Sequence, residues 1–159
     1  MREAEIKALL VDPYNSAPVI LLKDRHSSKA MPIWIGEAEA MSIALGLQSG
    51  RFPRPLAHDL MKEIIDDLNG SVERVEISGL KDGTYYASIF LRNPSGKIME
   101  IDARPSDSLA LALRMGSPIY IADEVFEASA IESPFAEEDA FRDFIEYQMN
   151  LRQFKKLIG

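Results

Sequence analysis

The segment that most constrains the fold runs from Ile98 to Ile121, where a strand pattern passes directly into a helix pattern. Residues 98–103 alternate and include β-branched side chains, which is typical of a β-strand. Pro105 suits the first turn of a helix, where its missing N–H would have no partner, and Gly116 suits the helix end. The residues between them are apolar on nearly every side, so we expect this helix to be buried.

Charged side chains gather where this helix begins. Asp102 and Arg104 immediately precede it, and Asp107 falls in its first turn. An acidic side chain in a first helical turn interacts favourably with the helix dipole. A buried helix whose charges lie at one end is also where we expect a functional site.

The same pattern occurs twice in the chain. When the sequence is aligned with itself so that Ile35 falls on Ile101, Ser42 falls on Ser108. The two copies cover about residues 5–50 and 71–116, and each indicates three strands followed by a helix. Because the matching residues are mostly apolar, chance similarity is the alternative to duplication.

These patterns predict one α+β domain over residues 1–159. We expect a mixed, largely antiparallel sheet or pair of sheets, built from a duplicated βββα unit whose helices are buried. A C-terminal helical tail is expected over residues 122–159, with helices over 122–130 and 137–147.

Two further helices are predicted in the first half of the chain. The first runs from Ala38 to about Ser49, and Glu39 lies in its acidic first turn. The second runs from Leu56 to Leu68, and His58 falls at the edge of its apolar stripe. That stripe consists of Leu56, Leu60, Met61, Ile64, Ile65 and Leu68.

The composition excludes several kinds of site. The chain has no cysteine, which excludes disulfides and thiolate metal sites and is compatible with a cytoplasmic location. It has no apolar run of about 18 residues, so no membrane span is expected. The net charge of −7 argues against a general nucleic-acid binder. This net charge does not exclude an enzyme that binds a phosphodiester in one local basic pocket.

Three segments together resemble the bifunctional nuclease family. They are residues 32–40 (PIWIGEAEA), 54–60 (RPLAHDL) and 100–107 (EIDARPSD), and the resemblance extends over roughly residues 5–145. It implies an α+β fold and metal-assisted cleavage of both DNA and RNA by a homo-oligomer, a dimer or larger. Two alternatives stay open: a non-catalytic oligomeric module that binds a protein or a small anionic ligand, and a hydrolase of a small phosphoester.

Cleavage of a phosphodiester with a hard cation would place carboxylates around Mg²⁺ or Mn²⁺. Asp102 and Asp107 are the candidate ligands from the second repeat, and Glu39 is the equivalent carboxylate of the first. Each has a simpler interpretation: Asp107 and Glu39 as ordinary residues of a helix start, and Asp102 as the partner of Arg104 in a structural ion pair.

The remaining steps of the reaction require a phosphate contact and a proton carrier. The candidates for the phosphate contact are Arg104 and Arg54. The candidate catalytic residues are His58, which would carry the proton, and Asp102, Arg104 and Asp107. Alternatively, Arg54 is solvated and His58 is a packed, hydrogen-bonded residue. Trp34, the single tryptophan, is either a core or interface residue or a platform on which a base stacks.

Overall fold

An eight-stranded mixed sheet forms the centre of the computed structural model, which describes residues 1–12, 14–48 and 53–132. The strand order is β6-β5-β4-β7-β1-β2-β3-β8, and every neighbouring pair is antiparallel except β4 and β7. The strands are β1 (Arg2–Val11), β2 (Pro18–Asp24), β3 (Lys29–Trp34), β4 (Ser71–Lys81), β5 (Thr84–Arg92), β6 (Ile98–Ala103), β7 (Ile119–Ile121) and β8 (Ile131–Glu132).

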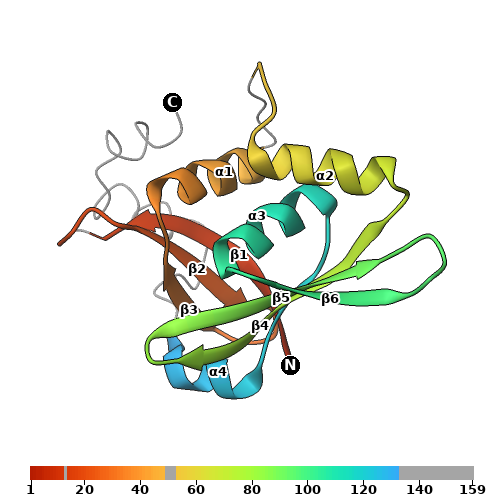
Figure 1. Ribbon diagram of the computed structural model, residues 1–159. Coiled ribbons are helices and arrows are strands. Elements are labelled where there is room, and N and C mark those ends of the chain that lie inside the picture. Colours follow the sequence, from red (N-terminus) through yellow and green to blue (C-terminus); the bar gives the residue numbers. More distant parts are fainter. Residues whose placement is uncertain (13, 49–52, 133–159) are drawn as a thin grey trace.

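The helices are α1 (Glu37–Gln48), α2 (Ala57–Asp67), α3 (Pro105–Met115) and α4 (Asp123–Ser129). Figure 1 shows α1, α2 and α3 together on one side of the sheet, with α4 away from them. The predicted helix over residues 137–147 lies outside the described residues.

The order of elements repeats along the chain. Strands β1, β2 and β3 are followed by α1, and strands β4, β5 and β6 are followed by α3. The short strand β7 joins the two three-stranded units, because it pairs with β1 on one side and with β4 on the other. The predicted α+β class and the mixed, largely antiparallel sheet are therefore confirmed. Duplication as the origin of this order stays a prediction.

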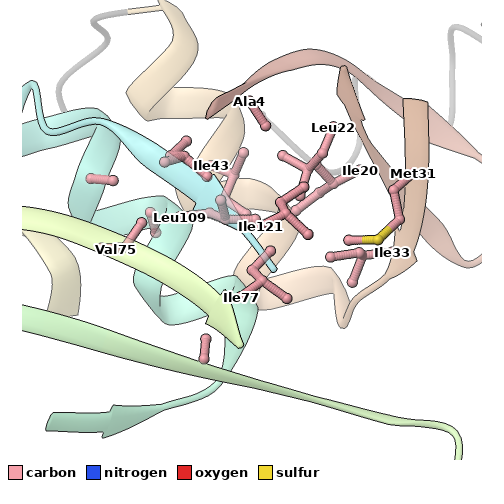
Figure 2. Close-up of a cluster of buried hydrophobic side chains, with 14 of the residues drawn as sticks. Ala4, Ile20, Leu22, Met31, Ile33, Ile43, Val75, Ile77, Leu109 and Ile121 are labelled. Carbon is pink, nitrogen blue, oxygen red and sulfur yellow. The ribbon is translucent and has the colours of Figure 1, made fainter. Parts of the chain in front are cut away.

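Helix α3 is the buried centre of the domain. It begins at Pro105 and is followed by Gly116, whose φ of 65° is the left-handed conformation that glycine adopts without strain. Leu109 and its neighbours up to Ala112 are buried. In Figure 2, Leu109 belongs to the same cluster as Val75 of β4 and other core residues. Truncating so buried a leucine to alanine typically costs about 2–5 kcal/mol.

Helix α1 approaches α3 closely at one glycine. A Cβ atom added to Gly46 would lie 3.2 Å from Leu113 and 3.3 Å from Nη1 of Arg114. Both side chains belong to α3, so a larger residue at this position would require these neighbours to shift by a few tenths of an ångström. The close contact lies near the ends of both helices.

Helix α2 forms an outer layer, and most of its apolar stripe is exposed. Only Ile65 of the stripe packs against the core cluster, and the one buried residue within the helix is His58. The exposed members are Leu60, Met61, Ile64 and Leu68. The amphipathic pattern therefore predicted the helix but not which residues it buries, because the main neighbour of α2 is the helix α3.

No helix in the described part of the chain is both long enough and apolar enough to cross a membrane. The cytoplasmic location expected from the absence of cysteine stays a prediction.

Candidate functional site

The charged beginnings of α1 and α3 meet at Arg104. Its Nη1 atom donates a hydrogen bond of 3.1 Å to Oε1 of Glu39, and its Nε donates one of 2.9 Å to Oδ2 of Asp107. Glu39 and Arg104 lie 65 positions apart in the sequence. The first turn of α1 and the start of α3 therefore lie at one charged site.

His58 extends this arrangement into the protein. Its Nε2 atom lies 2.9 Å from Oδ1 of Asp107, and its Nδ1 lies 2.6 Å from Oγ of Ser42. Because an ionised carboxylate only accepts, Nε2 carries the ring hydrogen and donates a hydrogen bond to Asp107. In the neutral ring, Nδ1 then accepts from the Ser42 hydroxyl. We call the connected residues Ser42, His58, Asp107, Arg104 and Glu39 the polar cluster.

Asp107 is held in its charged form by its partners. Burial alone would raise the pKa of its carboxyl group, but the hydrogen bonds from Arg104 and His58 outweigh that effect and lower the pKa below its ordinary value. The carboxylate therefore holds the guanidinium with one oxygen and the imidazole with the other.

Arg114 fixes the helices that carry the cluster. Its side chain is nearly buried, and Nη2 donates to the backbone oxygen of Ser42 at 3.0 Å while Nη1 donates to that of Ala110 at 2.9 Å. Its Nε donates to Oδ1 of Asp59 in α2 at 2.7 Å. Burial alone would raise the pKa of Asp59, but the hydrogen bonds from Arg114 and from the backbone N–H of Leu56 outweigh it and lower the pKa. One guanidinium thus ties α1, α2 and α3 together.

Two adjoining depressions open beside the cluster and share Glu39 and Arg104. The first, the His58 pocket, has a volume of about 450 Å³. The second, the Trp34 pocket, has a volume of about 430 Å³. Both volumes fall in the range of about 300–1,000 Å³ that is usual for small-molecule sites. The His58 pocket is lined by Ala38, Glu39, Met41, Ser42, Leu56, Ala57, His58, Met61, Arg104 and Asp107.

The structure does not bring Asp102 into the polar cluster. Asp102 is exposed and pairs across the sheet with Ser88, whereas Ile101 pairs with the core residue Ile89. Since successive side chains of a strand point to opposite faces, Asp102 faces away from the side of the sheet that α3 covers. Its carboxylate makes no hydrogen bond or ion pair with the described residues and lines neither of the two pockets.

Arg54 also lies apart from the cluster. It is exposed in the segment before α2 and lines neither pocket. Its predicted contact with substrate phosphate stays a prediction.

The predicted metal ligands do not form a metal site as they are arranged. Over residues 1–12, 14–48 and 53–132, no three His, Asp or Glu side chains gather closely enough to hold an ion. Glu39 and Asp107 are both engaged by Arg104, and Asp102 faces the other side of the sheet. Dependence on Mg²⁺ or Mn²⁺ stays a prediction.

Two members of this arrangement were not identified from the sequence. In the sequence, Ser42 stands out only as the repeat match to Ser108, and Arg114 is one basic residue near the end of the predicted helix. Ser42 did carry a signal, because a hydroxyl in a buried, apolar helix requires a hydrogen-bond partner. The contacts of Arg114 join three helices, and nothing local in the sequence indicates them.

Comparison with known proteins identifies the family. The model of the bifunctional nuclease domain matches residues 20–134, most of the chain, so the chain belongs to the bifunctional nuclease domain family. An uncharacterized protein of Mycobacterium tuberculosis is 41% identical over 135 residues, which cover 84% of this chain and 79% of the relative.

Plant proteins that are named as nucleases are more distant relatives. Bifunctional nuclease 1 of Oryza sativa is 26% identical over 112 residues, and bifunctional nuclease 1 of Arabidopsis thaliana is 26% identical over 111 residues. These matches cover 67% and 68% of this chain but only 34% of each plant protein. The resemblance to this family noted in the sequence is thereby confirmed.

Proposed function

We propose that this chain is a nuclease that hydrolyses phosphodiester bonds in DNA and RNA at the His58 pocket. The observation that carries the proposal is the polar cluster itself. It joins a guanidinium, a carboxylate, an imidazole and a hydroxyl through hydrogen bonds along one open depression. Membership of the bifunctional nuclease domain family gives the class of substrate.

Arg104 is suited to bind the phosphate. Its side chain is 64% exposed, and its two hydrogen bonds use Nε and Nη1. No described residue accepts from Nη2, so N–H groups remain for the non-bridging oxygens of a phosphodiester. A guanidinium placed there stabilises the negative charge that grows on the phosphoryl group in the transition state.

His58 is suited to move the proton. The attacking water forms its bond to phosphorus and gives its proton to the Ser42 hydroxyl, which passes its own proton to Nδ1 of His58. The resulting imidazolium is stabilised by Asp107, which already accepts from Nε2. As the bond from phosphorus to the sugar oxygen breaks, the same route returns a proton to that oxygen.

Glu39 is the carboxylate that a phosphate would displace. The site holds one guanidinium between two carboxylates, and the chain has a net charge of −7, so a polyanion has to compete for Arg104. The pair between Glu39 and the exposed Arg104 is of a kind worth about 0–1 kcal/mol, so its loss costs little. Asp107 remains bound to His58 and keeps the catalytic end of the cluster in place.

The exposed face of α2 favours a second candidate function, a non-catalytic oligomeric module. Leu60, Met61, Ile64 and Leu68 are exposed on or just after one helix, as they would be on a surface that another chain covers. The same face supports the predicted homo-oligomer, which is compatible with either function.

Cleavage by purified protein distinguishes the two functions. Labelled single-stranded DNA and RNA are incubated with wild type, His58→Ala and His26→Ala, each with and without a chelator. His26→Ala is the matched control because His26 is an exposed loop residue outside the cluster. We expect His58→Ala to lose about 10²–10⁴-fold in rate and His26→Ala to match wild type. Equal activity in all three proteins contradicts the assignment, and the chelator arm tests the metal.

A further inference from the structure

The Trp34 pocket has the character of a site for a flat, apolar group. Among the described residues that line it, only Glu39 and Arg104 are charged, and the His58 pocket shares both. The remaining wall combines two aromatic side chains, Trp34 and Tyr85, with small residues such as Gly36. A mostly apolar depression with a few polar groups at one border is the usual form of a small-molecule site.

Both aromatic side chains of this pocket are held by hydrogen bonds. The indole Nε1 of Trp34 donates to Oδ2 of Asp12 at 3.0 Å, and the hydroxyl of Tyr85 donates to Oγ of Ser129 at 2.8 Å. Trp34 nevertheless leaves 54% of its surface exposed, which argues against a core position; an interface position and a platform for base stacking stay predictions. A large aromatic side chain that is oriented but uncovered is suited to receive a ligand by stacking.

Arg104 lies on the border between the two pockets. A phosphate bound by its guanidinium would therefore have His58 and Asp107 on one side and Trp34 and Tyr85 on the other. A nucleotide presents a phosphate and a flat aromatic base that are joined by one sugar, which matches this sequence of groups.

We propose that the Trp34 pocket is a nucleobase subsite, in which a base of a single-stranded substrate stacks on Trp34 while the adjoining phosphate binds Arg104. This inference rests on the proposed nuclease function and adds the orientation of the substrate. Every base has an aromatic face, and stacking makes no contact with the 2′-hydroxyl. The subsite accordingly accepts DNA and RNA with little preference for sequence.

Trp34 is the single tryptophan of the chain, so it reports directly on its own stacking. Stopped-flow mixing of wild type with a short adenine oligonucleotide reads indole fluorescence before turnover. An abasic oligonucleotide of the same length supplies the phosphates without bases. We expect the adenine oligonucleotide to quench the fluorescence and the abasic oligonucleotide to leave it nearly unchanged.

Trp34→Ala tests the contribution of stacking to affinity, measured by anisotropy of the labelled oligonucleotide. We expect binding of the adenine oligonucleotide to weaken about 5- to 140-fold, the equivalent of one stacked base. Tyr86→Ala is the matched control, because Tyr86 is 46% exposed but does not line the pocket. It is expected to bind as wild type does, and circular dichroism confirms that both variants fold.

The outcomes separate this inference from the nuclease function. Cleavage by wild type without quenching, and with unchanged affinity in Trp34→Ala, overturns the subsite and leaves the nuclease in place. Quenching by the base-bearing oligonucleotide alone, in a protein that cleaves nothing, supports the subsite and overturns the nuclease. Equal quenching by both oligonucleotides overturns the subsite, because the response would then come from the phosphates.

Discussion

Replacing Arg104 with glutamine is expected to remove most of the activity and to leave the stability of the fold almost unchanged. The side chain is 64% exposed, and exposed ion pairs such as those with Glu39 and Asp107 contribute about 0–1 kcal/mol. Loss of one charge-stabilising donor in a transition state costs about 10²–10³-fold in rate, or about 2.7–4 kcal/mol. The expected loss of transition-state stabilisation is therefore larger than the expected loss of folding stability.

The assay compares single-turnover cleavage of labelled single-stranded DNA with the midpoint of urea unfolding. Arg25→Gln is the matched control, because Arg25 is also half exposed and also bonds two carboxylates, Glu3 at 3.0 Å and Glu5 at 3.6 Å. It removes the same charge outside both pockets. A folded Arg104→Gln protein with wild-type activity, or an equal loss in Arg25→Gln, would refute the reasoning.

Substitutions at Ser42, Asp102, Ile64 and Asp24 test four other features of the structure. Ser42→Ala leaves Nδ1 of His58 buried without a partner, so it should cost about 1–3 kcal/mol in urea unfolding and about 10²-fold in cleavage rate, whereas Ser42→Thr should retain activity. Asp102→Asn should cleave at nearly the wild-type rate, and a large loss would restore Asp102 to the site. If α2 forms the oligomer interface, light scattering should find wild type as a dimer or larger and Ile64→Asp as a monomer; two equal masses would exclude that interface. Burial alone would raise the pKa of Asp24, but hydrogen bonds from His26, Arg2 and Ser27 outweigh it and lower the pKa below the unfolded value. Its contribution to stability is therefore present above about pH 4 and lost as the pH falls through the folded pKa, and Asp24→Asn should flatten this dependence in acid unfolding.

The parts of the fold that local chemistry determines could be predicted from the sequence. Pro105 and Gly116 mark the two ends of α3 because each is suited to a backbone conformation that occurs at a helix terminus. The strand–strand–strand–helix order followed from hydrophobic periodicity, which depends on nearby residues. These signals also located Glu39 and Arg104 at two helix starts.

The parts that depend on tertiary packing could not be predicted. Ile64 is exposed because α2 packs on α3 through other residues. The amphipathic pattern of α2 does not indicate which part of the helix contacts α3. The hydrogen bond from Arg114 to the backbone oxygen of Ser42 joins residues 72 positions apart. Asp102 is a different case. The alternation of β6 already indicates that Asp102 and Ile101 point to opposite faces of the sheet, whereas the placement of Asp102 in the site relied on its closeness to Arg104 in the sequence.

The most direct test of the nuclease assignment is single-turnover cleavage of DNA and RNA by Asp107→Asn beside wild type. This substitution keeps the shape of the side chain but removes the charge that holds both Arg104 and His58. We expect that wild type cleaves both polymers and that Asp107→Asn cleaves each about 10²-fold or more slowly while remaining folded. Equal rates for the two proteins would contradict it.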